Sequence, residues 1–327
     1  MPVLSIGTYD QAEAKAIIRA CYPAIRAFRP AAFTMANFPT RISDERELVR
    51  YADIMCEIAN RNHWYREVRY SAKEAELISQ LASRIEELTA GMGHRIRPFM
   101  CLFPPIPVLR AVEALASGRK LRILEIGPGS GHLGAYLIRS GHAYIATDNA
   151  QALYLWQNRL FRSLAGAAFI ESASGDRAEG PDFAKPQVVH VPWWDFAEWY
   201  RDPPSFDLVV CDAAMGEMDV LAANYIIRLA AEMLRRSTVG AFLFRHIGEC
   251  RLNTLPYIES RFQSARFMRT EGDGVTLHCL SPLKLPEKLV PVGGGIELLT
   301  ASSFLPIDSD KLLESYSFFD FIRFTDP

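Results

Sequence analysis

The sequence has no run of about 18 apolar residues, which excludes a helix that spans a membrane. Its first residues, MPVLSIGTYDQAEAK, lack the basic segment and apolar core of a secretory signal. Six cysteines are scattered along the 327 residues, and no two of them form a C-x-x-C pair. This use of cysteine is typical of reduced, buried thiols rather than of disulfides. Together these absences predict a cytoplasmic protein without a membrane partner.

The sequence also lacks an excess of charge of either sign. It has 36 Lys and Arg against 38 Asp and Glu, with a net charge of −2 and a pI near 6.4. Proteins whose main partner is a nucleic acid usually carry a basic excess, so no such partner is predicted. A G-x-S-x-G elbow, a P-loop and zinc-ligand spacing are all missing as well. What remains is an ordinary globular composition, with 49% hydrophobic and 23% charged residues.

The chain divides by sequence pattern into three parts. Residues 1–118 have the apolar spacing of helices, most clearly in SAKEAELISQLASRIEELTAG, where Ser71 and Glu74 form a capping box. Residues 119–283 alternate between strand-like and helical stretches. Residues 284–327 form a C-terminal extension that ends in the aromatic SYSFFDFIRF, and we expect it to pack on the core.

The second part predicts an α/β fold. Its apolar runs are typical of strands buried on both faces, and they cover residues 121–126, 143–147, 187–191, 206–211 and 239–245. Helical stretches lie between most of them, as in a parallel sheet covered on both sides. Two further runs in ARFMRTEGDGVTLHCLSPL are joined by Gly272-Asp273-Gly274, and so short a turn requires antiparallel strands.

The stretch RILEIGPGSGHLGAYLI, residues 122–138, reads as a strand, a glycine loop and a helix. Gly127, Gly129 and Gly131 allow a sharp turn and a close approach of ligand to backbone, next to the free N–H groups of the helix start. The loop also satisfies G-x-G-x-x-G, the dinucleotide fingerprint, with Asp148 near the expected position of a ribose-binding acid. A nicotinamide-dependent oxidoreductase is therefore one alternative.

Three features favour a different nucleoside cofactor. Glu125 ends the strand before the loop, where a carboxylate would repel a pyrophosphate but suits a ligand with an ammonium group. Asp195 follows the third strand and could accept a hydrogen bond from the exocyclic amine of adenine. The closing hairpin shows that the second half is not another complete mononucleotide-binding unit.

The motifs LEIGPGSG, Asp148, Asp195-Phe196 and FDLVVCDAAMGEM, in this order, resemble those of class I S-adenosylmethionine-dependent methyltransferases. The resemblance covers about residues 119–282. It implies a Rossmann-like, mostly parallel sheet of seven strands with an antiparallel last strand, and S-adenosylmethionine as the cofactor. The GEM element within the last motif is similar to that of a sugar O-methyltransferase group.

The resemblance also implies roles for the individual residues. The glycine loop would pass under the methionine part of the cofactor, with Glu125 at the amino-acid end and Asp148 at the ribose hydroxyls. Asp195, with Phe196 or Trp194, would frame the adenine. The full set expected at the cofactor is Glu125, Ile126, Gly127, Pro128, Gly129, Gly131, Asp148, Asn149, Trp194, Asp195, Phe196 and Asp212. The alternative is that the acids are solvated at strand ends and that Trp194 belongs to the core.

Transfer of a methyl group to a hydroxyl requires a base that removes the proton. Acceptors lie at the carboxyl ends of the strands, where Asp212 and Glu217 follow the fourth strand and His246 follows the fifth. His246 is the first choice of base, with Glu217 and Asp212 as alternatives. The alternative for His246 is a structural role, in which it caps a strand end. The same acids could hold a divalent metal, but without a second cluster no metal is predicted.

These observations predict a methyltransferase that acts on a small molecule, most simply on a hydroxyl of a sugar or secondary metabolite. An N-methyltransferase and a non-catalytic cofactor-binding scaffold are the alternatives, besides the oxidoreductase. Residues 1–118 would supply the acceptor pocket, a lid or the surface of a homodimer.

Overall fold

The computed structural model describes residues 3–19, 22–28, 39–53, 70–98, 100–173, 187–212, 214–237, 239–245, 261–262, 264–270, 276–281 and 296–298. His246 and nearly all of the C-terminal extension lie outside these ranges.

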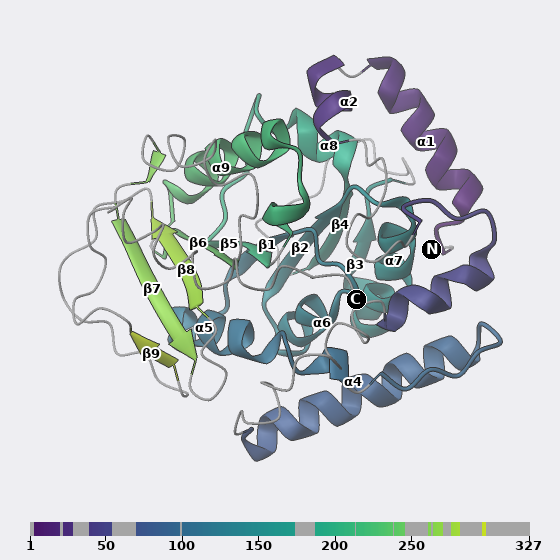
Figure 1. Ribbon diagram of the computed structural model, residues 1–327, viewed down its shortest axis with the longest axis horizontal. Coiled ribbons are helices and arrows are strands. Elements are labelled where there is room, and N and C mark those ends of the chain that lie inside the picture. Colours follow the sequence, from purple (N-terminus) through teal and green to yellow (C-terminus); the bar gives the residue numbers. More distant parts are fainter. Residues whose placement is uncertain are drawn as a thin grey trace, which may run out of the picture.

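One sheet occupies the centre of the molecule (Figure 1), with the strand order β3-β4-β2-β1-β5-β6-β8-β7-β9. The strands are β1 Arg122–Ile126, β2 Ala143–Asp148, β3 Phe169–Glu171, β4 Val188–Pro192, β5 Leu208–Asp212, β6 Ala241–Arg245, β7 Ser264–Thr270, β8 Thr276–Ser281 and β9 Ile296–Leu298. The six strands from β3 to β6 in this order pair in parallel. Beyond them, β8 runs antiparallel to β6, β7 antiparallel to β8, and β9 antiparallel to β7.

The α/β class and the parallel sheet with helices are as predicted. The five predicted parallel strands are β1, β2, β4, β5 and β6, and the predicted hairpin is the antiparallel pair β7 and β8. The count of seven strands is wrong, because the described residues contain nine, of which six rather than five are parallel. The two additional strands, β3 and β9, are three residues long and lie at the sheet edges. So short a segment has no periodicity that a sequence pattern could reveal.

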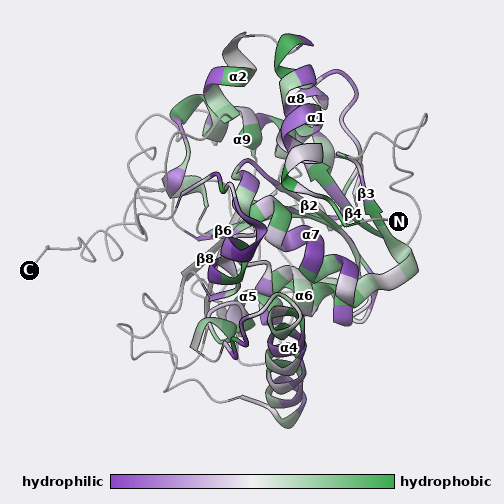
Figure 2. Cartoon of the chain, turned by 90° about the vertical axis from the view of Figure 1, so that its right-hand side faces the viewer, coloured by the Kyte–Doolittle hydropathy of each residue, from purple (hydrophilic) through white to green (hydrophobic). Residues whose placement is uncertain are grey.

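The parallel strands form the hydrophobic core. All residues of β2 and β6 are buried, and so are all but the first of β1. Continuous apolar strands of this kind are expected where helices cover both faces of a parallel sheet. Figure 2 shows the hydrophobic strands β2, β3 and β4 enclosed between the helices.

Helices cover both faces of the sheet (Figure 1). One layer consists of α8 Trp193–Glu198 and α9 Val220–Leu234, with α1 Ile6–Arg19 and α2 Tyr22–Phe28 packed on it. The other consists of α5 Ile106–Ala116, α6 His132–Arg139 and α7 Gln151–Ala165, with α4 Ala72–Ala90 outside. Short 3₁₀ segments are η1 Glu45–Asp53, η3 Met100–Leu102, η4 Gly166–Ala168 and η5 Met215–Glu217. Among the described helices, none is both long enough and apolar enough to cross a membrane.

The predicted capping box starts helix α4. The Ser71 hydroxyl accepts a hydrogen bond from the Glu74 amide at 3.2 Å, and the Glu74 carboxylate accepts one from the Ser71 amide at 2.7 Å. The apolar spacing in SDERELVRYADIMCEIANR, residues 43–61, also predicts an α-helix, but its segment η1, which precedes α4 in the chain, is a 3₁₀ helix. Its predicted continuation to residue 61 lies outside the described residues.

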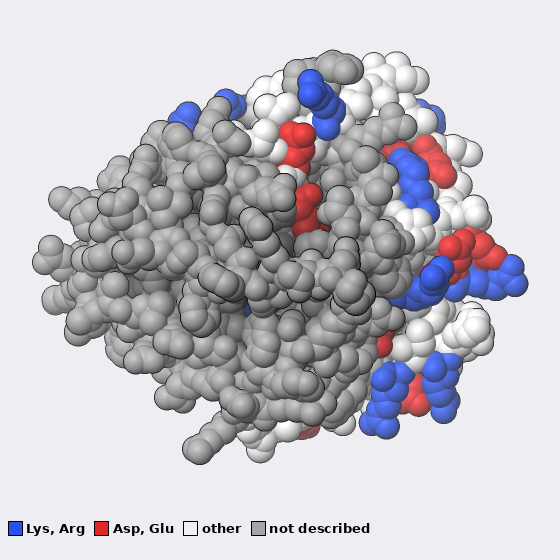
Figure 3. All heavy atoms as spheres, in the orientation of Figure 1, with Lys and Arg blue, Asp and Glu red and all other residues white. Residues whose placement is uncertain are grey.

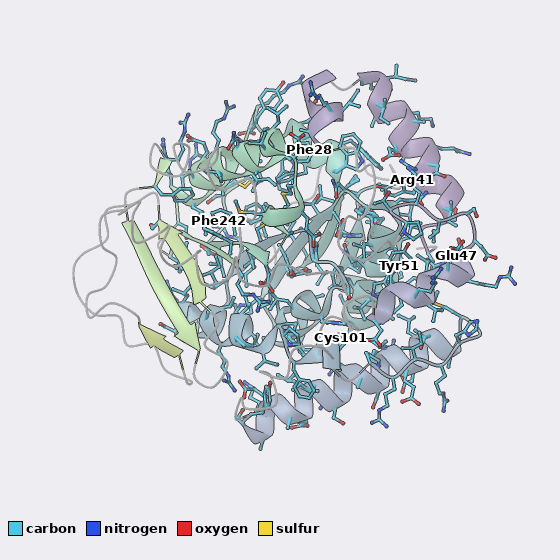
Figure 4. All side chains as sticks on the ribbon, viewed as in Figure 1. Phe28, Arg41, Glu47, Tyr51, Cys101 and Phe242 are labelled. Carbon is cyan, nitrogen blue, oxygen red and sulfur yellow. The ribbon has the colours of Figure 1, made fainter. Side chains whose placement is uncertain are left out.

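Aromatic contacts attach the N-terminal helices to the α/β core. Phe28 of α2 meets the rings of Phe196 and Tyr225 edge-on, at centroid distances of 5.9 and 5.3 Å. Figure 4 shows Phe28 between α2 and the layer of α8 and α9. Edge-to-face aromatic pairs of this kind contribute beyond their buried area, so the packing of α2 is specific.

Candidate cofactor and acceptor site

The predicted acids lie at one edge of the sheet. Glu125 is the penultimate residue of β1, Asp148 ends β2 and Asp212 ends β5, while Asp195 stands in the first turn of α8 after β4. Because the carboxyl ends of parallel strands meet at the same edge, residues that are up to 87 positions apart in the chain surround one region. This edge is where α/β folds bind their ligands.

The glycine loop connects β1 to α6 at this edge. Gly127, Gly129 and Gly131 all have positive φ angles, +68°, +58° and +76°. A Cβ on Gly127 would lie 2.6 Å from the Ala214 Cβ, and one on Gly131 would lie 3.0 Å from the Phe161 ring, whereas one on Gly129 would meet nothing within 4 Å. The outer two glycines are thus required by packing, and the middle one borders open space where a ligand can approach the backbone.

Glu125 is a buried carboxyl beneath this loop. It accepts a hydrogen bond from the Tyr144 hydroxyl. Burial raises the pKa of Glu125 from its usual 4.5 to about 8, although the Tyr144 hydrogen bond lowers it, and the charges of Asp212 and Asp148 add to the increase. A cationic group placed beside Glu125 would favour its ionised form.

Asp148 is buried on the other side of the loop. One carboxylate oxygen accepts from the Ala150 amide at 3.0 Å and the other from the Gln157 side-chain amide at 2.8 Å. Gln157 also donates to the Gly129 carbonyl at 2.8 Å, so it links Asp148 to the loop. Burial raises the pKa of Asp148, while the hydrogen bonds lower it. The Gly129 backbone donates to this carboxylate as well, and a carboxylate with three donors keeps one lone pair that can accept a further hydrogen bond.

The residues predicted at the adenine divide into exposed and buried ones. Asp195 is exposed, yet desolvation by the surrounding protein, together with Glu171 and Glu198, raises its pKa to about 6. Such an acid is accessible to a ligand and poorly hydrated. Trp194 is 8% exposed, and its ring packs on that of Tyr9 with the ring centroids 5.1 Å apart.

Two other predicted cofactor residues are engaged within the protein. Phe196 is 1% exposed and belongs to the aromatic core around Phe28. Asn149 donates a hydrogen bond to the Phe28 carbonyl at 2.8 Å, so its side-chain amide holds the end of α2. Both side chains therefore already have partners within the protein, and their contact with a cofactor stays a prediction.

Asp212 is engaged in an ion pair with a residue that the sequence analysis did not consider. Arg245 ends β6 and contacts both Asp212 oxygens, with one N–O distance of 2.6 Å. Both side chains are largely buried. A bidentate ion pair of this kind engages both oxygens of the Asp212 carboxylate within the protein. The signal in the sequence was the arginine at the end of an apolar strand, in AFLFR.

Glu217 is an exposed acid after β5. It closes η5, its side chain is exposed, and desolvation by its surroundings, with the charge of Asp148, raises its pKa to about 7. Asp219 caps α9 by accepting from the Leu221 amide at 2.8 Å. The first-choice base, His246, lies outside the described residues.

Three hydroxyl groups around this edge are buried without a hydrogen-bond partner. They belong to Ser130 in the loop, Thr147 next to Asp148, and Tyr9 of α1, whose ring packs on Trp194. Unpaired buried hydroxyls are rare, and a polar ligand is one group that would satisfy them. In the described part of the chain, no three His, Cys, Asp or Glu side chains are grouped to hold a metal ion.

Charge on the visible face of the molecule is mixed. In Figure 3 the described Lys, Arg, Asp and Glu side chains alternate over the N-terminal elements near η1 and α4. Several form ion pairs, such as Arg84 with Glu87 at 3.0 Å and Arg159 with Glu45. The described residues of this face thus present both signs rather than a basic patch.

No family model and no curated protein matches the sequence. By contrast, 106 chains of solved structures are similar to it. They include the magnesium protoporphyrin IX methyltransferase ChlM from Synechocystis PCC 6803 with bound SAM, at 13% identity and a TM-score of 0.36, with 73% of this chain and 98% of that chain covered. They also include MtNAS in complex with MTA and tNA, at 14% identity and a TM-score of 0.40, with 65% and 70% covered. A third is the N-methyltransferase NodS from Bradyrhizobium japonicum WM9 with S-adenosyl-L-homocysteine, at 15% identity and a TM-score of 0.34, with 55% and 89% covered. At TM-scores below 0.5, the function of this chain has to be inferred from its own residues.

Proposed function

We propose that this protein is an S-adenosylmethionine-dependent methyltransferase that modifies a small molecule, with a hydroxyl oxygen of a sugar or secondary metabolite as the acceptor. The observation that carries the proposal is the pair of buried acids, Glu125 and Asp148, on the two sides of a glycine loop that opens at Gly129. One acid suits an ammonium group and the other suits ribose hydroxyls, so the site fits a nucleoside with an amino-acid tail.

The charge of the site disfavours a dinucleotide. Glu125, Asp148 and Asp212 lie close enough for the latter two to raise the pKa of Glu125. Of the described basic side chains there, Arg245 is already paired with Asp212. A pyrophosphate on this loop would therefore face acids, whereas the ammonium and sulfonium groups of S-adenosylmethionine would be attracted to them.

Each residue then has a defined task. When bound, S-adenosylmethionine supplies a reactive methyl group on its sulfonium sulfur. The loop Gly127–Gly131 would lie under the methionine part, with Glu125 at its ammonium group. Asp148 would accept from the ribose hydroxyls and Asp195 from the adenine amine. The protein's further contribution is to align the acceptor and exclude water.

Glu217 is the described residue best suited to take the proton of a hydroxyl acceptor. It is accessible and its pKa is about 7, close to the optimum for a general base at neutral pH. Asp212, held by Arg245, is the weaker candidate. A suitable base at this edge is consistent with a hydroxyl acceptor, whose proton has to be removed. His246 stays a prediction as an alternative base.

Calorimetric titration with S-adenosylhomocysteine, the demethylated product, tests the cofactor site. Gly129→Ala puts a methyl group into the open side of the loop without a clash inside the protein. We expect micromolar binding to the unaltered protein and at least about tenfold weaker binding to the variant, because the ligand approaches the backbone at this glycine.

Gly118→Ala is the matched control. Gly118 also has a positive φ, +80°, and open space around its Cβ position, but it precedes β1 at the opposite edge of the sheet. It shares the backbone strain of Gly129→Ala and should leave binding unchanged. Equal affinities for all three proteins, or binding of NADH in place of S-adenosylhomocysteine, would contradict the proposal.

The wider predictions belong to the same proposal. Residues 1–118 would form the acceptor pocket, a lid or a homodimer surface, residues 119–283 the cofactor-binding domain, and residues 284–327 an extension on the core. The protein would act in the cytoplasm without a nucleic acid or membrane partner. A screen of sugar hydroxyl and amine acceptors would separate O-methylation from N-methylation.

A further inference from the structure

A chain of buried polar side chains lies behind Asp148, away from the edge of the sheet. Gln157 of α7 is followed by His190 of β4, whose Nε2 is 3.2 Å from the Gln157 Oε1 atom. The other ring nitrogen of His190, Nδ1, is 3.1 Å from an oxygen of Glu171 in β3. All four side chains are buried. These side chains thus connect the three neighbouring strands β2, β4 and β3 through helix α7.

The hydrogen-bond partners determine how the Gln157 amide is oriented. Its nitrogen lies 2.8 Å from the Asp148 carboxylate and 2.8 Å from the Gly129 carbonyl, and both of these groups only accept. The Gln157 oxygen must therefore face His190, which has to donate from Nε2. A reversed amide would place an oxygen against two acceptors in a buried site.

Glu171 holds the other side of the His190 ring. It accepts from the Asn158 amide at 2.6 Å, from the Ala173 backbone at 2.9 Å and from the Tyr154 hydroxyl. Three such donors fit a carboxylate, so His190 Nδ1 faces a negative charge. Tyr154 also stacks on the His190 ring, at a centroid distance of 3.7 Å and an interplanar angle of 16°. The His190 ring is thus held on three sides, with Gln157 and Glu171 at its two nitrogens and Tyr154 on its face.

We propose that His190 is a positioning residue for the ribose-binding acid. It fixes the Gln157 amide, which holds the Asp148 carboxylate against the glycine loop so that the free lone pair of Asp148 faces the ribose hydroxyls of the cofactor. This inference rests on the proposed function. The affinity for the ribose then depends on the buried residues Gln157, His190 and Glu171 as well as on Asp148, which would contact the ribose.

The test is a thermodynamic cycle between protein and ligand. S-Adenosylhomocysteine and its 2′,3′-dideoxy analogue are titrated calorimetrically into the unaltered protein and into His190→Phe, which keeps a ring against Tyr154 but has no N–H groups. We expect the loss of the two hydroxyls to weaken binding at least about tenfold in the unaltered protein, because hydrogen bonds to charged groups are strong. In the variant the same loss should be under about threefold, since the Gln157 amide no longer fixes the second oxygen of Asp148.

Two further variants keep the test decisive. Glu171→Gln/His190→Phe removes the buried carboxylate together with its partner, and so provides a folded protein if the single variant is unstable. Tyr154→Phe deletes another donor to Glu171 but leaves the His190–Gln157 contact, and should retain the full tenfold effect. If the dideoxy analogue lost the same affinity, relative to S-adenosylhomocysteine, in His190→Phe as in the unaltered protein, the inference would be overturned. If the unaltered protein bound no S-adenosylhomocysteine at all, the proposed function would fail together with it.

Discussion

At the scale of single residues, Glu125 couples the site to the stability of the protein. The pKa of Glu125 is about 8 in the folded protein and 4.5 in its usual state, so between these pH values the folded chain holds a proton that the unfolded chain has released. The free energy of unfolding therefore falls as the pH rises through this window, by an amount on the order of a few kcal/mol.

Glu125→Gln should abolish this dependence. The amide can still accept the Tyr144 hydrogen bond but has no proton to lose. Urea denaturation at pH 5 and pH 8 is expected to show a variant that gains stability relative to the unaltered protein at the higher pH, while its affinity for S-adenosylhomocysteine falls. A parallel pH dependence in the two proteins would show that Glu125 is not the group responsible.

The role of Glu217 makes a separate prediction, for turnover. A general base works in its deprotonated form, so kcat should rise with pH through a pKa near 7. Glu217→Gln should lower kcat by roughly 10²-fold, because proton removal typically contributes that much, and leave cofactor affinity unchanged. A variant that keeps both its turnover and the inflection near pH 7 would assign the base elsewhere, with His246→Ala as the next variant to measure.

Sequence and structure agree on these residues to different degrees. The glycines and the acids could be predicted because they lie at the ends of strands. In a parallel sheet the carboxyl ends of the strands meet at one edge, so residues at these ends come together there. The partners could not: Arg245 reaches Asp212, and Gln157 reaches Asp148, from other elements of the fold. A single sequence contains no signal for such contacts between distant residues, and it likewise did not reveal that Phe196 faces the core.

At the scale of elements, the Asp212–Arg245 ion pair joins the ends of β5 and β6. Both partners are largely buried, and the charge of Asp212 also raises the pKa of Glu125. Arg245→Met should destabilise the protein by about 3 kcal/mol, since it leaves a buried carboxylate unpaired beside other acids. Chemical denaturation measures this cost.

The paired variant distinguishes charge from packing. Asp212→Asn/Arg245→Met removes the unpaired charge and should recover much of the lost stability, because buried ion pairs contribute little beyond their mutual compensation. If the double variant were as unstable as the single one, the contribution of Arg245 would come from its packing instead.

Elements with strong local signals were predicted well. The capping box of α4 and the apolar runs of β1, β2, β4, β5 and β6 each carry enough residues for a clear pattern. The sequence missed β3 and β9, whose three residues acquire strand structure only by pairing with β4 and β7. It also predicted an α-helix where η1 is a 3₁₀ helix, since the apolar spacings of the two helix types are similar over a few residues.

At the scale of the whole molecule, the N-terminal helix α1 is tied to the same edge of the sheet as the candidate site. The ring of Tyr9 packs between those of Trp194 and Tyr154, at centroid distances of 5.1 and 5.2 Å. Glu13, also in α1, accepts a hydrogen bond from the indole N–H of Trp193 at 2.8 Å. Trp194 neighbours the acid proposed for the adenine, and Tyr154 belongs to the network behind Asp148. Ordering of the site by a ligand should therefore also restrain α1.

Hydrogen exchange followed by mass spectrometry can detect this coupling. Saturating S-adenosylhomocysteine is expected to slow amide exchange in Ile6–Arg19 as well as in the glycine loop, because opening of α1 would break contacts that the bound state stabilises. Helix α4, which lies in the other helical layer, serves as the internal control and should change little. In Tyr9→Ala the protection of α1 should be lost while that of the loop persists. Protection confined to the loop in the unaltered protein would instead mean that α1 packs on the edge of the sheet independently of the cofactor.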